Sequence, residues 1–234
     1  MPSAKRGYPD FDPRIPPGWR VVLSDPWPIN TTIGPNEEAP DFDTWRFETY
    51  GSVANPLSLT YEDFLRLPRV KILVDHHCID GWSYLGHEWA GVPLHEIAKV
   101  TMPSDSARHI LIECERGVSQ TFPIDQDLLL ATERNGKPLT REGGFPLRAV
   151  APGEYGYKSS KWVRKIKFTS TREYDFYEKG AIALGIPPVP PGENPWNCND
   201  PERKKVLRKF FSGMVEAERK RRAKRWAIEH GNSK

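Results

Sequence analysis

Cysteine is scarce in this sequence, and the common cysteine motifs are missing. The 234 residues include three cysteines, Cys78, Cys114 and Cys198, at wide spacing. An odd number of distant cysteines argues against a disulfide framework, and the chain has neither a CxxCH haem motif nor the cysteine set of an iron–sulfur cluster. We therefore expect reduced thiols, as in a cytoplasmic protein.

Long apolar runs are also missing. No stretch approaches the roughly 18 consecutive apolar residues that a membrane-spanning helix needs. The first 17 residues contain neither the apolar segment of a signal peptide nor a twin-arginine pair. Both observations favour a cytoplasmic location and predict that no segment spans a membrane.

Positive charge is concentrated at the C-terminal end. Residues 200–234 carry 12 Lys and Arg against 5 Asp and Glu, a net charge of +7, so the preceding 199 residues carry −4 within the total of +3. The tail either folds an apolar stripe back on the body or docks an acidic partner or an anionic surface. Nucleic acid is not an expected partner, because the body is acidic and no nucleic-acid-binding module is recognisable.

The periodicity of apolar residues predicts one α+β domain over residues 18–185. An irregular arm (1–17) precedes it, and a Pro-rich linker (186–201) and a basic amphipathic helix (202–234) follow it. Strands are expected at residues 44–51, 70–78, 109–114, 118–124, 146–152 and 160–169. Short helices are expected at residues 60–68, 92–100 and 172–185, and a short helix followed by a strand at 125–139.

Three local patterns make these expectations specific. Thr60 is a helix N-cap with acidic residues in the turn that follows. The segment 70–78 has the composition of a buried strand, and the segment 125–139 ends at an Asn-Gly turn. In the last strand, one face is predicted to carry Trp162, Arg164, Ile166 and Phe168.

Cys78 lies in the stretch VDHHCIDGWSYLGHEW, which also contains three of the six histidines. Zinc is disfavoured, because His76, His77 and Cys78 are consecutive and no second pair of ligands exists. A nucleophilic cysteine with a neighbouring histidine as base fits the composition, but no protease-type signature accompanies it. A buried, inert thiol at the end of a strand fits equally, so the residues alone leave these interpretations open.

The segment 143–168 combines glycine with cationic and hydroxyl side chains. Glycine lets backbone N–H groups approach a ligand closely, and Ser, Lys and Arg donate hydrogen bonds to an anion such as phosphate. The segment matches neither the P-loop GxxxxGK[ST] nor GxGxxG. A hairpin loop with solvated lysines is the alternative interpretation. The residues concerned are Gly143, Gly144, Arg148, Gly153, Gly156, Lys158, Ser159, Ser160, Lys161 and Arg164.

Several motifs together resemble the sulfite-oxidase-type molybdopterin oxidoreductases. They are WRFETYGSVANPLSLTYEDFLRLPRV, HHCIDGWSYLGHEWAGVPLHEI and LLLATERNGKPLTREGGFPLRAVAPGEYGYKSSKWVRKIKF, in the order found in the family. The resemblance covers about residues 15–180 and is strongest to small single-domain bacterial members, which include the catalytic subunit of protein-methionine-sulfoxide reductase. It implies mixed β-sheets with short peripheral helices and a molybdenum–molybdopterin cofactor.

The resemblance also implies roles for individual residues. Cys78 is similar to the thiolate that ligates molybdenum, which makes it the metal-binding and catalytic residue. His77 is expected near the pterin, and Cys114 either near the pterin or in the core. Tyr157, with Tyr155, is expected to wall the pocket. The phosphate is expected to be held by Arg148, Lys158, Ser159, Ser160 and Lys161, with further pterin contacts from Asn30, Thr32 and Gly34.

The implied reaction is transfer of an oxygen atom to or from a small sulfur or nitrogen oxide. Sulfite oxidases carry an arginine pair just after the cysteine, whereas this chain has Ile79 and Asp80, which favours the reductase direction. Sulfite oxidation at the same site, or a degenerate binding module that acts through the basic tail, are the alternatives. Electrons have to be exchanged with a separate protein or small carrier, because the chain has no haem or iron–sulfur motif.

Overall fold

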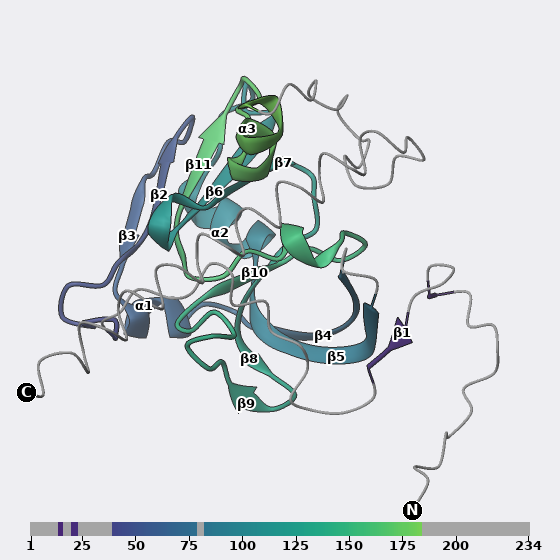
Figure 1. Ribbon diagram of the computed structural model, residues 1–234. Helices are drawn as coiled ribbons and strands as arrows, with labels where there is room; N and C mark the ends of the chain where they lie inside the picture. The colour runs from purple at the N-terminus through teal and green to yellow at the C-terminus, as the bar shows by residue number, and fades with distance from the viewer. Residues whose placement is uncertain (1–13, 16–19, 23–38, 79–81, 184–234) are drawn as a thin grey trace, which may run out of the picture.

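Two β-sheets and a few short helices make up the described part of the computed structural model, which covers residues 14–15, 20–22, 39–78 and 82–183 (Figure 1). Sheet A contains β1 (Arg20–Val21), β4 (Val70–Cys78), β5 (Trp82–Pro93), β8 (Leu129–Arg134), β9 (Lys137–Pro138) and β10 (Arg148–Val150). Sheet B contains β2 (Phe47–Gly51), β3 (Leu57–Leu59), β6 (His109–Cys114), β7 (Ser119–Pro123) and β11 (Val163–Thr169).

The helices are all short. They are α1 (Tyr61–Leu65), α2 (Leu94–Thr101) and α3 (Phe176–Ala183), with 3₁₀ turns η1 (Glu115–Gly117) and η2 (Gly156–Lys158). The segregation of strands and helices confirms the predicted α+β class. Thr60 begins α1 as expected, because its hydroxyl accepts a hydrogen bond from the Asp63 amide and the Asp63 carboxylate accepts one from the Thr60 amide.

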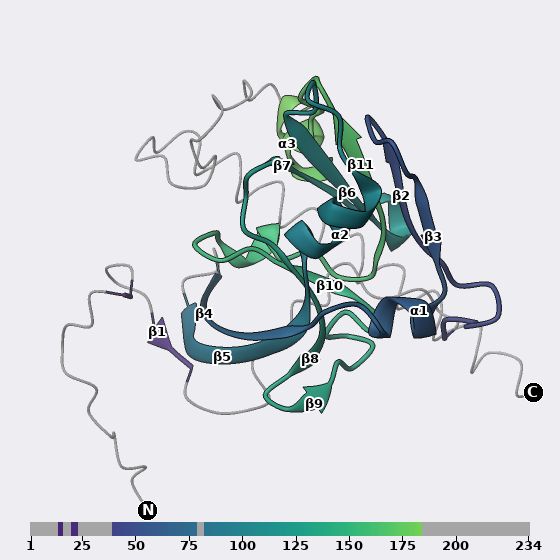
Figure 2. The same cartoon turned by 180° about the vertical axis from the view of Figure 1, so that it is seen from behind.

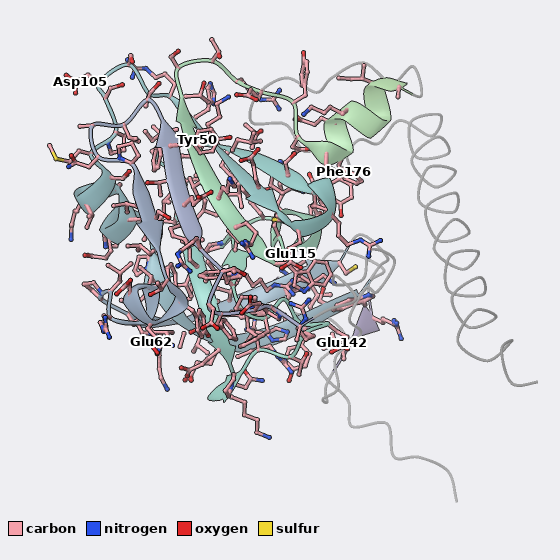
Figure 3. The ribbon with its side chains drawn as sticks, turned by 90° about the vertical axis from the view of Figure 1, so that its left-hand side faces the viewer. Tyr50, Glu62, Asp105, Glu115, Glu142 and Phe176 are labelled. Carbon is pink, nitrogen blue, oxygen red and sulfur yellow. The ribbon has the colours of Figure 1, made fainter. Side chains whose placement is uncertain are left out.

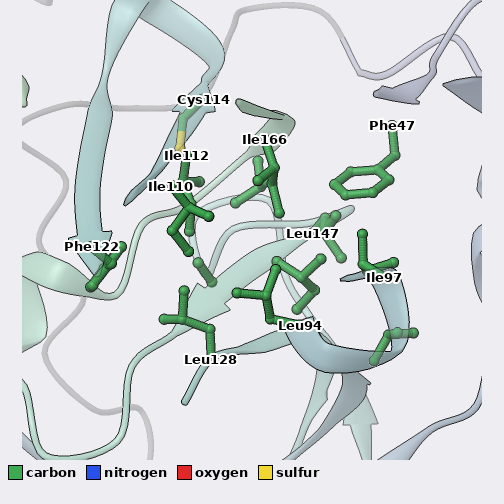
Figure 4. Close-up of a cluster of buried hydrophobic side chains, with 14 of the residues drawn as sticks. Phe47, Leu94, Ile97, Ile110, Ile112, Cys114, Phe122, Leu128, Leu147 and Ile166 are labelled. Atoms are coloured by element: carbon green, nitrogen blue, oxygen red, sulfur yellow. The ribbon is translucent and has the colours of Figure 1, made fainter. Parts of the chain in front are cut away.

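The main hydrophobic core lies between the two sheets and includes α2. Sheet B contributes Phe47, Ile110, Ile112 and Ile166, which are fully buried. Figure 4 shows these side chains packed against Leu94 and Ile97 of α2, Leu128 and Leu147, with Cys114 at the margin of the cluster. This core holds the two sheets together, and β4 and β5 extend away from it.

The hairpin of β4 and β5 is the longest feature of sheet A and curves strongly, as both views show (Figures 1 and 2). Its register pairs Val70 with Gly91 at one end and Cys78 with Trp82 at the other, with an irregularity at Asp75. The pairing of β5 with β8 has a second irregularity before Gly91. Such bulges bend a strand and increase its twist. The Cys78 end of the hairpin lies near η2, whose Gly156 contacts His76.

The expectation that residues 70–78 form a buried strand is wrong for the first half of β4. Val70 and Leu73 are exposed, Leu73 by 73 %, whereas His76 and Cys78 are buried. Within the described residues β4 pairs with β5 alone, so β4 is an edge strand of sheet A. Burial rises toward Cys78, where other elements pack on the hairpin.

The short helix predicted at the start of residues 125–139 is also wrong. The three leucines from Leu128 to Leu130 enter β8, which lies in the sheet between β5 and β10 and buries side chains on both faces. The Asn-Gly turn is confirmed, because Asn135 (φ 49°) and Gly136 (φ 71°) connect β8 to β9.

The predicted face of β11 is confirmed only in part. Ile166 and Phe168 are buried in the core. Trp162 precedes the strand with a φ of 59°, and the register shifts between Val163 and Lys165, so Trp162 does not follow the alternation of the strand.

Several predictions fall on residues outside the described part of the chain. These are most of the arm (1–17), the linker (186–201), the basic C-terminal helix (202–234) and the contacts expected from Asn30, Thr32 and Gly34. Among the described residues, no helix is long and apolar enough to cross a membrane.

Candidate functional site

Cys78 is the last residue of β4, and its thiol is buried. His76, two residues earlier, shares its face of the strand because side chains alternate along β4. Trp82 lies directly opposite Cys78 in the register, and its ring stacks on the His76 ring with centroids 5.5 Å apart. The thiol is thus placed at the edge of a packed aromatic surface rather than in a solvated loop.

Farther along the same hairpin, His87 continues this surface. Its ring is fully buried, 3.9 Å from the Tyr84 ring and 5.5 Å from the Trp89 ring between centroids. Arg134, from β8, places its Nη1 atom 3.2 Å from Nδ1 of His87. A cation from the neighbouring strand therefore lies against the histidines of the hairpin.

His76 is held as a neutral ring. Burial lowers its pKa well below the ordinary value, and the positive charge of Arg148 lowers it further. Gly156 of η2 packs directly on this ring, since a Cβ placed at Gly156 would lie 2.3 Å from Nε2 of His76. The turn of residues 156–158 therefore lies on the face of β4 that carries Cys78.

The side chain of His77 is directed to the other side of β4 by the alternation of the strand. It is half-buried, and its Nδ1 lies 2.9 Å from the hydroxyl of Ser83. Burial lowers its pKa, and the Asp75 carboxylate opposes that effect. Its expected contact with the pterin stays a prediction.

The structure brings together Arg148, Ser160 and Lys161, three of the residues that the resemblance assigned to the phosphate. The Ala149 amide donates to the Ser160 carbonyl (2.8 Å), and Arg148 and Lys161 form an antiparallel bridge. Gly144 has a φ of 115°, which residues with a side chain rarely adopt, and a Cβ there would make tight contacts of 3.2 Å with the Cβ atoms of both Arg148 and Lys161.

Arg148 is buried, and Lys161 beside it is partly buried, with its Nζ donating to the Glu142 carbonyl (3.2 Å). Arg148 donates to the Gly143 carbonyl (2.9 Å) and lies 5.3 Å from the centroid of the Trp89 ring. Burial lowers the pKa of Arg148 to about 9, with a further contribution from the charge of Arg134. Burial lowers the pKa of Lys161 to about 7, and the charge of Arg148 contributes. Mutual repulsion of buried cations is relieved when an anion binds between them.

Ser160 supplies a second indication of an anionic ligand. Its hydroxyl is buried, lies beside the Cys114 thiol and has no nitrogen or oxygen partner within the described residues. Buried hydroxyls are normally hydrogen-bonded, so this group is available to a ligand oxygen. The Ser160 hydroxyl and the clustered cations fit a phosphate such as that of molybdopterin.

Lys158 and Ser159 belong to the same sequence motif as Ser160 and Lys161, but their contacts are with other residues. Lys158 places its Nζ 2.8 Å from an Oδ2 of the buried Asp175 and donates to the Thr121 carbonyl (3.3 Å). Ser159 is buried, and its amide donates to the Gly156 carbonyl (3.1 Å). The contacts expected between these two side chains and the phosphate stay predictions.

Tyr157 and Tyr177 face each other with ring centroids 5.6 Å apart. Tyr177 follows Phe176, the first residue of α3, which Figure 3 labels. Burial raises the pKa of Tyr177 to about 12, and the charges of Asp175, Cys114 and Cys78 add to the effect. Tyr177 therefore lies within electrostatic reach of both described cysteines. Tyr157 had been expected to wall the pocket, whereas Tyr177 had not been identified as a site residue.

The sequence analysis did not identify Arg134 or Tyr177 as site residues, because neither lies in a recognisable local motif. Arg134 is one of many charged residues before the Asn-Gly turn, and Tyr177 is separated from Cys78 by 99 positions in the chain. Cys114, for which two positions were expected, lies at the edge of the hydrophobic core (Figure 4). Burial raises the pKa of its thiol to about 12, so it is protonated near neutral pH.

A buried thiol at the end of β4 and a cluster of cations near Gly144, carried on two mixed sheets, fit an oxidoreductase of the molybdopterin-binding class. Residues 34–177 match the family model described as the oxidoreductase molybdopterin binding domain, which is more than half of the chain. The chain belongs to this family and is an enzyme that binds molybdopterin, with a sulfite-oxidase-like fold.

Relatives at several distances support the family assignment. The chain is 38 % identical over 188 residues to the uncharacterized oxidoreductase YuiH of Bacillus subtilis. The aligned region covers 79 % of this chain and 93 % of YuiH. It is 29 % identical to the protein-methionine-sulfoxide reductase catalytic subunit MsrP of Campylobacter jejuni, over 61 % of this chain and 56 % of MsrP. The chain thus spans only about half of that relative.

A solved structure shows the same fold. The sulfane dehydrogenase SoxCD of Paracoccus pantotrophus superimposes with a TM-score of 0.53 at 25 % sequence identity. The superposition covers 57 % of this chain and 40 % of that one. The predicted sulfite-oxidase-type arrangement of mixed sheets is therefore confirmed.

Proposed function

We propose that this enzyme transfers an oxygen atom from a small sulfur or nitrogen oxide, using a molybdenum–molybdopterin cofactor that Cys78 ligates. The observation that supports the proposal is that His76 links the thiol to the anion-binding groups. Cys78 and His76 share a face of β4, and the charge of Arg148 acts on His76. A soft thiolate and a phosphate cradle at the same place suit a metal that arrives on a phosphorylated dithiolene.

Each part of the site has a distinct task in this proposal. When bound, the cofactor would supply a metal that takes up one oxygen atom while it gives up two electrons, or that does the reverse. Cys78 holds the metal, while Arg148, Ser160 and Lys161 hold and neutralise the phosphate. His76 stays neutral and, with Trp82, excludes water from the thiol. The protein thus contributes binding, orientation and a dry site.

The direction of the reaction rests on the sequence after the cysteine. Ile79 and Asp80 stand where sulfite oxidases have cationic side chains, so an oxyanion substrate gains no charge pairing there. We therefore favour reduction of an uncharged oxide over oxidation of sulfite. The names of the relatives include both a methionine-sulfoxide reductase and a sulfane dehydrogenase, so the family alone leaves the direction open.

Electrons reach the site from a separate redox protein or small carrier in this proposal, because the sequence contains no haem or iron–sulfur motif. A role of the basic tail in docking that partner stays a prediction, as does the cytoplasmic location. The expected pterin contacts of His77, Asn30, Thr32 and Gly34 are likewise predictions.

The test compares the unsubstituted chain with Cys78→Ser and Arg148→Ala after expression in a host that makes molybdopterin. Pterin content is measured by fluorescence after oxidation. Turnover is measured with sulfoxides and N-oxides under a reduced viologen dye, and with sulfite under ferricyanide. Lys165→Met is the matched control, because Lys165 pairs with Glu48 on the surface of sheet B.

We expect oxide reduction by the unsubstituted chain and by the control. Cys78→Ser is expected to fold but not to turn over, and Arg148→Ala to contain less pterin. Oxide turnover by the serine variant would refute the role of Cys78. Sulfite oxidation without oxide reduction would refute the proposed direction and support the alternative reaction.

A further inference from the structure

Lys158 is held by contacts that leave it unsuited to bind the cofactor phosphate. Its ammonium lies 2.8 Å from Asp175 Oδ2 and 3.3 Å from the Thr121 carbonyl, and 5.3 Å from the centroid of the Phe122 ring. The Lys158 side chain is 13 % exposed and that of Asp175 1 % exposed. If Lys158 turned to a phosphate, Asp175 would remain as a buried carboxylate without its cation, which is strongly unfavourable.

Asp175 in turn organises the start of α3. Its Oδ1 accepts from the Glu178 amide, and the Glu178 carboxylate accepts from the Asp175 amide, each at 2.9 Å. This reciprocal pair is the capping arrangement that begins a helix. Arg172 pairs with Glu178, and the Thr121 hydroxyl donates to the Glu173 carbonyl (2.6 Å). The N-terminal end of α3 is therefore fixed by its own cap, by β7 and by Lys158.

The other end of this connection lies at the candidate site. Lys158 is the last residue of η2, whose first residue, Gly156, packs on the ring of His76. Between them, Tyr157 faces Tyr177 of α3 with ring centroids 5.6 Å apart, and its carbonyl accepts from Nε2 of Gln120 (3.0 Å). The ion pair therefore joins the turn that covers His76 to the helix that presents Tyr177.

We propose that Lys158 is a positioning residue that latches the turn of residues 156–158 to the start of α3. This contact holds Tyr157 and Tyr177 in place as one wall of the Cys78 site. The substrate passes along this wall as it approaches Cys78. Lys161, whose neighbours are Arg148 and Ser160, is the lysine of this motif that binds the phosphate. This inference rests on the proposed function, and it assigns different tasks to two lysines that are three positions apart.

The experiment compares Lys158→Met, Lys158→Arg, Asp175→Asn, the double variant Lys158→Met/Asp175→Asn, and Lys161→Met, each as the full chain purified with cofactor. Lys165→Met serves as the surface control. The readouts are pterin content, hydrogen exchange of the amides in Phe176–Ala183, and KM and kcat for a sulfoxide. Pterin content and hydrogen exchange do not depend on the reaction that the enzyme catalyses.

A latch predicts that Lys158→Met and Asp175→Asn behave alike. Both keep their pterin, whereas Lys161→Met loses it by about tenfold. In both, the α3 amides exchange about tenfold faster, and the double variant is no faster than either single variant because the pair acts as a unit. KM rises by about fivefold while kcat stays within about twofold, and Lys158→Arg restores KM.

Two results would overturn the inference. Loss of pterin in Lys158→Met but not in Asp175→Asn would show that Lys158 binds the phosphate. Faster exchange in α3 with an unchanged KM would show that α3 does not form the wall. If no variant, including the unsubstituted chain, reduces oxides, the proposed function fails, while pterin content and exchange still decide whether the latch exists.

Discussion

Adding one methyl group at Gly156 tests how closely η2 is seated on the histidine beside Cys78. A Cβ at this position would lie 2.3 Å from Nε2 and 2.5 Å from Cε1 of His76. Ordinary van der Waals contact begins at 3.4 Å, so the ring or the turn must move by about 1 Å. Gly156 is not among the glycines with positive φ, so the effect of Gly156→Ala is one of space rather than of backbone conformation.

The ring has little room to retreat. His76 is buried, stacks on Trp82 at 5.5 Å and meets the edge of His87 at 6.0 Å between centroids. Overpacking of a filled interior costs about 1–3 kcal/mol, which is the loss of unfolding free energy that we expect for Gly156→Ala. Because the displaced ring is two residues from Cys78, we also expect lower pterin content in this variant.

The assay is urea unfolding of chain from a host without molybdopterin, followed by tryptophan fluorescence. The substitution is made in the original chain and in a His76→Ala background, which removes the ring. In that background Gly156→Ala should cost less than about 0.5 kcal/mol, because the clash is gone and Gly→Ala alone restricts the unfolded chain. An equal cost in both backgrounds would refute the packing of Gly156 on His76.

Three further predictions concern other parts of the structure. The pKa of Cys114 is raised from 9.0 to about 12, so the folded chain keeps a proton that the unfolded chain loses, and its contribution to stability is lost between pH 9 and 12. Urea unfolding should show that Cys114→Ala reduces this pH dependence, and an unchanged slope would contradict it. The pKa of Lys161 is lowered from 10.5 to about 7, so in chain without cofactor its contribution is present above pH 10.5 and is lost as pH falls through 7. Lys161→Met should therefore raise the urea midpoint at pH 6 more than at pH 10, and the reverse order would be inconsistent with burial of this lysine. Thr60→Ala removes the cap of α1 and should cost about 1 kcal/mol of unfolding free energy with no change in pterin content, and a loss of pterin would show that α1 affects the site.

Local signals predicted much of the fold. Three predicted features depend only on neighbouring residues, and each is present in the structure: the cap at Thr60, the Asn135-Gly136 turn and a strand within residues 44–51. The failures come from tertiary context. Residues 70–78 are apolar enough for a buried strand, but Val70 and Leu73 lie on an uncovered edge.

The part of the candidate site that could be predicted is the part whose residues all lie in one sequence motif. Arg148, Ser160 and Lys161 meet because the 159–163 segment runs back along β10, as a glycine-rich connection between two predicted strands allows. The contacts of Lys158 with Asp175, and of Gly156 with His76, join segments far apart in sequence. No periodicity or spacing specifies such pairs, so they required the structure.

The role of Cys78 as the molybdenum ligand is tested by X-ray absorption at the molybdenum edge, on the unsubstituted chain and on Cys78→Ser purified with cofactor. We expect one more sulfur ligand in the unsubstituted chain than in the serine variant, because the Cys78 thiolate adds to the dithiolene sulfurs of the pterin. The same number of sulfur ligands in both proteins would contradict the assignment of Cys78 and, with it, the proposed site.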